Sequence, residues 1–203
     1  MRRALFAFLI FSPFFTGAQL ALIFQMKPLS KPFQLDVLRF YITHVVVEYE
    51  NGEHFVDSTL AYLLDNEIPE SYTVNLPNAP NVPVKEVHFR VGTDSVLNVA
   101  GVLDGALDPI KGMYWAWNTG YINFKLEGSF DGKALEYHIG GYRAPYTTDR
   151  PITVAIHSPE NKINVNLLPW LEKAQAAKID TMMIPGEKAA WLANNFELIF
   201  TGD

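Results

Sequence analysis

Short runs of β-branched and aromatic residues, each interrupted after a few positions by Gly, Pro, Asn or Asp, fill positions 20 to 153 of the chain. Runs of this length, most with alternating apolar and polar positions, are typical of strands in an antiparallel sandwich or barrel. The dipeptides Asn51-Gly52 and Asp131-Gly132 predict tight hairpin turns. The candidate strands are 21–26, 38–49, 71–75, 86–92, 120–129, 135–140 and 151–156. We therefore predict an all-β fold, an antiparallel β-sandwich.

The C-terminal part of the chain has a different composition. Segments 167–178 and 186–195 are rich in Ala, Leu, Lys and Glu, with Trp170 and Trp191 at core-facing positions. These features predict two short helices, a short helical C-terminal tail that closes one end of the sandwich. Because no linker interrupts the pattern, we predict a single domain over residues 19–203.

The N-terminus has the pattern of an export signal. Arg2 and Arg3 precede an apolar run from Ala4 to Phe15, and small residues follow up to Ala18. This arrangement predicts a signal peptide over residues 1–18, removed after Ala18. The apolar run has roughly a dozen residues, fewer than the about 20 that span a bilayer. We therefore expect a periplasmic or secreted product with no membrane span in its mature form.

Composition excludes several classes of function. The chain has no cysteine, which removes disulfides and thiolate metal sites. Lys and Arg total 16 against 22 Asp and Glu, without the basic clusters that nucleic-acid binding requires. No nucleophile elbow, phosphate loop or zinc-protease helix is present in the sequence. We therefore expect a binding protein rather than an enzyme, with no nucleic acid among its partners.

Two segments carry a recognisable pattern: GTDSVLNVAGVLDGALDPIKGMYWAWNTGYINFKLEG at 92–128 and EYHIGGY at 136–142. They resemble the core signature of the MbnP-like family, and LRFYITHVVVEYENG and the closing segment 183–200 fit the same family. The resemblance therefore covers nearly all of the expected mature chain. The matching residues are Phe40, Tyr41, Asn98, Met113, Trp115, Trp117, Gly120, Tyr121, His138 and Gly140.

The resemblance implies an exported copper-binding or copper-handling protein without catalytic activity. Members of the family bind copper through histidines and a kynurenine formed from a tryptophan, and a di-haem peroxidase-type partner enzyme often accompanies them. Imidazole suits copper, and opening of an indole creates a carbonyl and an aniline that can also ligate. The implied metal ligands are His138 and Trp115 or Trp117. In copper-binding members a histidine follows the loop asparagine, whereas Val99 occupies that position here, so one imidazole is missing.

Each candidate ligand also has an ordinary structural explanation. His138 can be a strand histidine hydrogen-bonded to a loop carbonyl. Trp115 and Trp117 are two positions apart, so we expect both indoles to face the same side of a strand and to pack in the core. His44 shares the alternation of Ile42 and Val46 along the first long strand, which predicts an inward or rim position. It could replace the missing ligand only if it lay beside His138. The alternative function is a sandwich that has lost the metal site and serves as a structural or interaction module.

Overall fold

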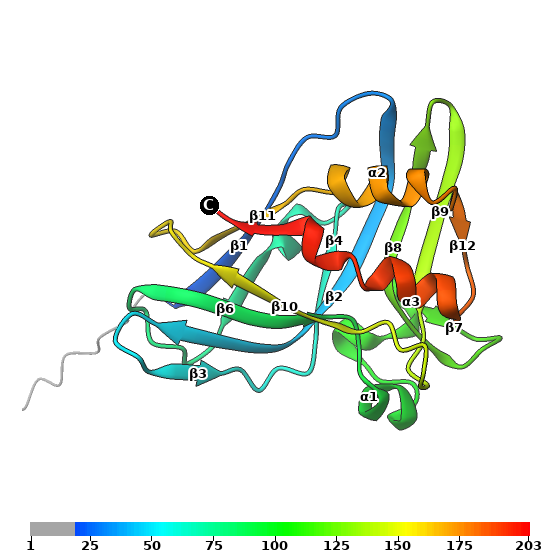
Figure 1. The fold of residues 1–203 in the computed structure, drawn as a ribbon. Coiled ribbons are helices and arrows are strands. Elements are labelled where there is room, and N and C mark those ends of the chain that lie inside the picture. The colour runs from blue at the N-terminus through cyan, green and yellow to red at the C-terminus, as the bar shows by residue number, and fades with distance from the viewer. Residues whose placement is uncertain (1–18) are drawn as a thin grey trace, which may run out of the picture.

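Two β-sheets face each other across a shared core in residues 19–203, the part of the chain that the computed structural model describes (Figure 1). The predicted signal peptide lies outside the described residues. The larger sheet has the order β10 (Arg150–Ala155), β6 (Val84–Val91), β2 (Phe33–Tyr49), β8 (Gly120–Phe130), β9 (Lys133–Gly140) and β12 (Thr181–Met182). In addition, β3 (His54–Val56) and β4 (Tyr62–Asp65) pair with β2, and β7 (Tyr114–Trp115) pairs with β8. The smaller sheet has the order β13 (Phe200–Gly202), β11 (Lys162–Val165), β1 (Leu20–Met26) and β5 (Thr73–Leu76). The predicted β-sandwich is confirmed.

Alternation of side chains along the strands produces the two layers. On β9, Leu135, Tyr137 and Ile139 are buried in the main core, whereas Glu136 between them is exposed. Asp131 and Gly132 both have positive φ, as a two-residue type I′ hairpin requires, and they connect β8 to β9. The turn with Asn51 and Gly52 connects β2 to β3, which also pair, so both predicted hairpins form.

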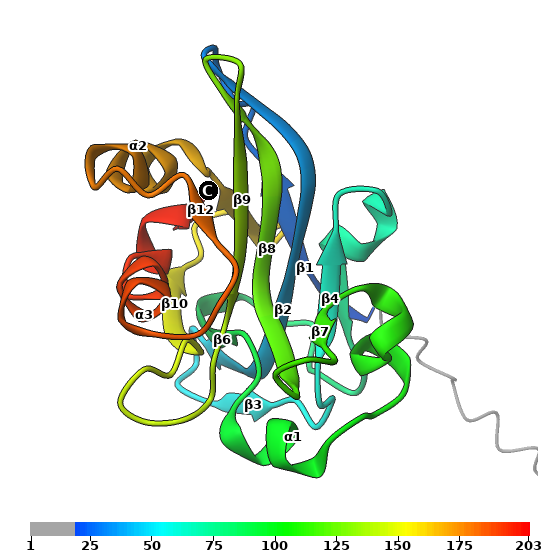
Figure 2. The ribbon, with the colours of Figure 1, turned by 90° about the vertical axis from the view of Figure 1, so that its right-hand side faces the viewer.

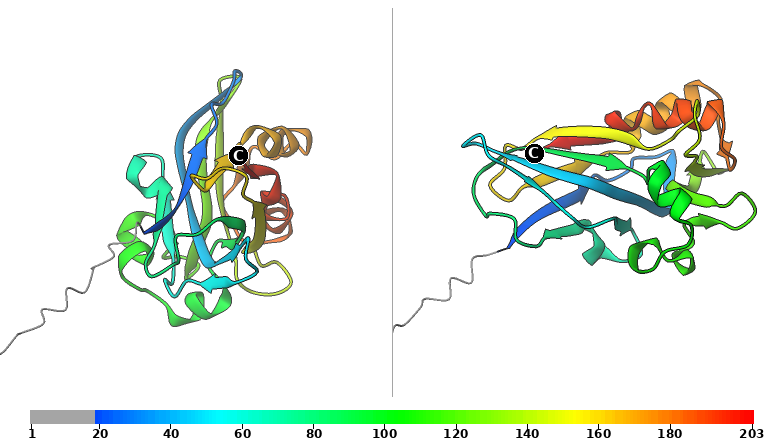
Figure 3. Two further views of the ribbon diagram at one scale, coloured as in Figure 1. Left: turned by 90° about the vertical axis from the view of Figure 1, so that its left-hand side faces the viewer. Right: turned by 90° about the horizontal axis from the view of Figure 1, so that it is seen from below.

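Aromatic side chains connect the two sheets through the main core. Phe200 of β13 meets Phe89 of β6 and Phe40 of β2 edge to face, with ring centroids 5.3 and 5.8 Å apart. Phe24 of β1 packs against the same Phe89 ring at 5.7 Å. The view from below in Figure 3 shows β2 running along most of the length of the molecule. Side chains of this one strand therefore contribute to the main core from Phe33 to Tyr49.

The two predicted helices form in the C-terminal part, but they cover one side of the long strands rather than closing one end of the sandwich. These are α2 (Leu168–Ala176) and α3 (Glu187–Ala193), which lie on one side of β2, β8 and β9 while the loop with β7 lies on the other (Figure 2). Trp170 is buried and Trp191 is half-buried. Among the described residues, no helix combines the length and apolar character that a membrane crossing needs.

The remaining helical segments are short. They are α1 (Ser95–Ala100) and the 3-10 helices η1 (Pro69–Tyr72), η2 (Gly105–Leu107), η3 (Pro109–Lys111) and η4 (Phe196–Ile199). Two strand pairs also differ from a purely antiparallel arrangement, because β1 pairs with β11 and β9 with β12 in parallel. Both pairs join strands that are far apart in the sequence, so no tight hairpin fixes their direction.

Candidate functional site

A second, smaller apolar cluster lies on the face of the large sheet opposite to the main core. Phe40 and Ile42 of β2 belong to the main core, whereas Tyr41 between them belongs to this second cluster. We call it the second core; its buried members are Tyr41, Ala61, Leu97, Leu107, Met113, Trp115, Tyr121 and Ile122. Four of these, Tyr41, Met113, Trp115 and Tyr121, are residues that carry the family resemblance. The signature therefore converges on one place in the fold.

Hydrogen bonds of the Asn98 side chain connect α1 to the start of β8 beside the second core. Its side chain is buried, and Oδ1 accepts a hydrogen bond of 2.9 Å from the backbone N–H of Tyr121. Nδ2 donates to Oγ1 of Thr93 at 2.9 Å and to the backbone carbonyl of Asp94 at 2.7 Å. Oδ1 of Asp94 in turn caps α1 by accepting from the N–H of Leu97. The asparagine of the family signature thus has a structural role here.

We expect Asn98→Ala to lower the free energy of unfolding by about 1 to 3 kcal/mol, because the buried N–H of Tyr121 would lose its acceptor. Chemical denaturation of the purified protein measures this change. The matched control is Val99→Ala at the next position, where the side chain is 76% exposed. That variant should stay within about 0.5 kcal/mol of the parent. Equal losses in the two variants would contradict the structural role of Asn98.

The indole of Trp115 lies directly on Gly140 of β9. Trp115 is only 6% exposed, and a Cβ placed on Gly140 would lie 2.7 Å from Cζ3 of the indole. The backbone oxygen of Tyr121 would be even closer, at 2.5 Å, so the ring and the neighbouring strand together require glycine at this position. The expected packing role holds for Trp115.

The expectation that both indoles pack in the core is wrong for Trp117, which is 64% exposed. The strand β7 ends at Trp115, and residues 116–119 form the turn to β8, so strand alternation does not extend to Trp117. The two rings nevertheless touch, with centroids 5.6 Å apart. Trp117 therefore presents an indole to solvent next to a buried one.

His138 lies on β9 two residues before Gly140, so its side chain is on the sheet face that Trp115 covers. The imidazole is 13% exposed, and its Nε2 is 2.8 Å from Oε1 of Glu127 on β8. Nζ of Lys125 is 3.1 Å from the same oxygen. Partial burial acts to raise the pKa of Glu127, but the hydrogen bonds from His138 and Lys125 outweigh it, and the pKa lies below its usual value. His138 is thus bound to a carboxylate rather than to the loop carbonyl that we expected.

The register of the strands shows which way the imidazole points. Glu127 is paired with Glu136, which precedes His138 on β9, whereas Gly140 follows it. The Nε2 atom is therefore directed away from the ring of Trp115. Sequence reasoning did not single out Glu127 or Lys125, although the alternation of β8 places both on the face opposite to buried Phe124 and Leu126.

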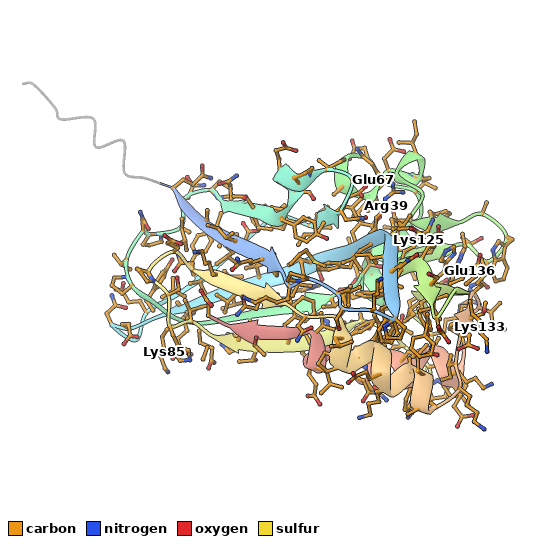
Figure 4. The ribbon with its side chains drawn as sticks, turned by 90° about the horizontal axis from the view of Figure 1, so that it is seen from above. Arg39, Glu67, Lys85, Lys125, Lys133 and Glu136 are labelled. Carbon is orange, nitrogen blue, oxygen red and sulfur yellow. The ribbon has the colours of Figure 1, made fainter. Side chains whose placement is uncertain are left out.

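This part of the sheet face is strongly charged. Arg39 of β2 is paired with Lys125 and forms ion pairs with Asp65 and Glu67. Figure 4 shows Glu67, Arg39, Lys125 and Glu136 following one another across the sheet. The surroundings of His138 therefore combine an aromatic cluster on one side with a row of ion pairs on the other.

Of the two positions expected for His44, inward or rim, the inward one is wrong for a local reason. The ladder between β2 and β6 shifts register between Thr43 and Val46, and His44 has φ of 51° in this bulge. The bulge breaks the alternation, so the imidazole is exposed. Its Nε2 is 3.4 Å from Oδ2 of Asp94.

The structure does not bring His44 and His138 together. His138 is paired with Lys125, which is paired with Arg39, so His138 is level with Arg39 on β2. His44 lies five residues further along β2, which corresponds to about 16 Å at about 3.3 Å per residue. In this arrangement His44 does not substitute for the missing loop histidine.

Residues 19–203 thus define a β-sandwich whose large sheet carries an aromatic second core and an adjacent histidine on its outer face. The sequence model of the MbnP family matches residues 7–184, and the chain belongs to this family, which is not a known family of enzymes. Among solved structures, MbnP from Methylosinus trichosporium is similar over 75% of this chain and 76% of that chain, with 14% sequence identity and a TM-score of 0.46. Among curated proteins, none matches the chain.

Proposed function

We propose that this chain is an exported, non-catalytic copper-binding or copper-handling protein of the MbnP type. Its family membership supports this function, and the observation that carries it is the placement of His138. His138 precedes Gly140 by two residues, and the indole of Trp115 rests on Gly140. The imidazole and the indole thus share one sheet face, and the positions of His138 and Gly140 are about 7 Å apart along β9.

The proposed ligand set combines His138 with an oxidised indole. Imidazole suits copper, and a kynurenine adds nitrogen and oxygen donors. Formation of kynurenine requires an external oxidising enzyme, and a di-haem peroxidase-type partner is the proposed one. Trp117 is the indole that such a partner can reach, because it is exposed while Trp115 is buried. A copper ion shared by His138 and the indole requires the imidazole to release Glu127 and turn, because Nε2 is directed toward Glu127 and away from Trp115.

Copper titration of the purified protein, under reducing and under oxidising conditions, tests this proposal. Under reducing conditions we expect one copper ion per chain, and His138→Ala should weaken its binding by at least about 10-fold, since even residues behind the ligands contribute that much. Divalent copper, present under oxidising conditions, can also bind other imidazole and carboxylate groups, so only the ion that depends on His138 supports the proposal. The matched control is His157→Ala, which removes an exposed histidine beyond β10 and should leave binding unchanged. Absence of stoichiometric copper, or equal binding by His138→Ala and the parent, would refute the ligand assignment.

A second candidate function is a sandwich that has lost its metal site and acts as a structural or interaction module. Two observations favour it: Val99 is an exposed apolar residue where copper-binding members carry histidine, and Glu127 already occupies Nε2 of His138. The same titration separates the two candidates. Protein isolated from its native host that contains neither copper nor an oxidised tryptophan would favour the module.

A further inference from the structure

A second group of side chains with metal-binding chemistry lies on β2 and β6. Glu86 and His88 are two positions apart on β6 and share a face, and Glu48 of β2 is paired directly with Glu86. Nε2 of His88 is 3.0 Å from Oε1 of Glu86 and 3.8 Å from Oε2 of Glu48. One ligand atom from each of the three residues lies within 4.8 Å of the other two. Three donors therefore converge on one point of the surface.

The spacing of these atoms suits a tetrahedral cation. Zn²⁺ holds nitrogen and oxygen ligands at about 2.1 Å, which places two tetrahedral ligand atoms about 3.4 Å from each other. The distances of 3.0 and 3.8 Å from Nε2 of His88 to the two carboxylates lie on either side of this value. Adjustment of the exposed ends of these side chains can therefore admit a cation without movement of the strands.

The charges around the site favour a cation. Glu48 and Glu86 are direct cross-strand neighbours, and like charges in that position destabilise a sheet. Lys85 offsets only part of this repulsion, because its ammonium binds Oε1 of Glu48 and leaves Oε2 directed toward His88. All three donor side chains are partly exposed, so an ion from solution can reach them.

The imidazole of His88 is oriented by a group behind it. Nδ1 lies 3.0 Å from Oγ1 of Thr153, which is the residue paired with His88 on β10. When Nδ1 donates its proton to Thr153, the lone pair of Nε2 faces the two carboxylates. Histidines that ligate metals are commonly held in this way by a hydrogen bond from the second ring nitrogen.

This group is separate from the surroundings of His138. In Figure 4, Lys85, whose ammonium contacts Glu48, lies at the opposite end of the molecule from Lys125 and Glu136. Lys125 and Glu136 lie beside His138 on β8 and β9. Occupancy of one location can therefore be measured independently of the other.

We propose that Glu48, Glu86 and His88 form a binding site for a divalent cation of the zinc type, with water in the fourth position. One imidazole and two carboxylates are ligands that Zn²⁺ accepts, and three protein ligands plus water is a known arrangement for it. Mg²⁺ and Ca²⁺ prefer six or more oxygen ligands, which this surface does not supply. The imidazole of His88 therefore favours Zn²⁺ and similar ions over Mg²⁺ and Ca²⁺ at this site.

Calorimetric titration of the purified full chain with zinc chloride, and separately with magnesium chloride, tests the proposal. We expect one zinc ion per chain and no measurable magnesium binding. His88→Ala and Glu48→Gln should each weaken zinc binding by at least about 10-fold, and Thr153→Val by about 10-fold through loss of the orienting hydrogen bond. His157→Ala, which removes an exposed histidine outside both proposed sites, is the matched control and should bind zinc as the parent does. His138→Ala reports whether the ion lies at His138 instead. Equal unfolding midpoints of the variants verify that each is folded.

Two results would overturn the proposal. The first is zinc binding that does not saturate at one ion per chain, or that His88→Ala leaves unchanged. The second is a loss of zinc binding in His138→Ala, which would place the ion at His138 instead. Because the copper proposal is judged by His138→Ala and the zinc site by His88→Ala, failure of either is distinguishable from failure of the other.

Discussion

Replacement of Trp170 by Ala is expected to lower the free energy of unfolding by about 3 to 5 kcal/mol. Trp170 of α2 is only 1% exposed and packs against Phe124, Tyr137 and Phe196, with ring centroids 5.3, 5.1 and 6.1 Å away. Its Nε1 donates a hydrogen bond of 3.0 Å to the carbonyl of Leu192 in α3. Truncation would therefore leave a cavity under both helices and remove a bond between them.

Chemical denaturation followed by circular dichroism measures the effect of Trp170→Ala. Trp191→Ala is the matched control, because Trp191 is only half-buried at the edge of the same core and should cost much less. Trp170→Phe should fall between the two, since it keeps an aromatic ring but loses the donor to Leu192. An effect of Trp191→Ala as large as that of Trp170→Ala would contradict the packing described here.

The second large effect is expected at Trp115, where truncation to Ala should cost about 3 to 5 kcal/mol. The buried indole fills the space above Gly140 and contributes to the second core. Trp117→Ala is the natural comparison, because it removes an exposed indole from the same turn. Its cost should be about 1 kcal/mol or less, mainly the contact with the Trp115 ring.

Denaturation of both variants should be accompanied by intact-mass analysis of protein from the native host and by peptide fragmentation, which locates any modification. A mass shift that maps to Trp117, together with the large stability loss only in Trp115→Ala, would divide the pair into a structural and a modified indole. An unchanged unfolding midpoint for Trp115→Ala, with a mass shift that maps to Trp115, would instead assign this residue to the ligand set. That result would contradict its packing role.

The longer strands could be predicted because burial repeats every second residue over enough positions to be seen. β9 shows this clearly, since Leu135, Tyr137 and Ile139 face the main core. The strands β3, β7, β12 and β13 have only two or three residues, too few to show a period. They exist because neighbouring strands supply hydrogen-bond partners, and a linear pattern does not contain that information.

The candidate site was predictable only in part. The resemblance singled out Trp115 and His138, but the spacing of the residues could not show that Trp117 turns outward after β7 ends. Nor could it show that His44 sits in a bulge, because a β-bulge depends on how two strands pair and not on one residue type. The carboxylate that binds His138 comes from Glu127 on another strand, and such pairings depend on register. The kinds of residue in the candidate site could therefore be predicted from the sequence. Which of them lie close together could be seen only in the folded structure.

The position of β1 between β5 and β11 constrains the order in which this chain can fold. β1 contains the first described strand residues, yet Phe24 is paired with Ile163, far along the chain. Because synthesis proceeds from the N-terminus to the C-terminus, the smaller sheet cannot be completed until β11 and β13 have been made. Closing such long loops before native contacts form slows folding, typically to milliseconds or seconds. β1 can therefore pair early with β5 on one edge, whereas its other edge stays open until β11 is available.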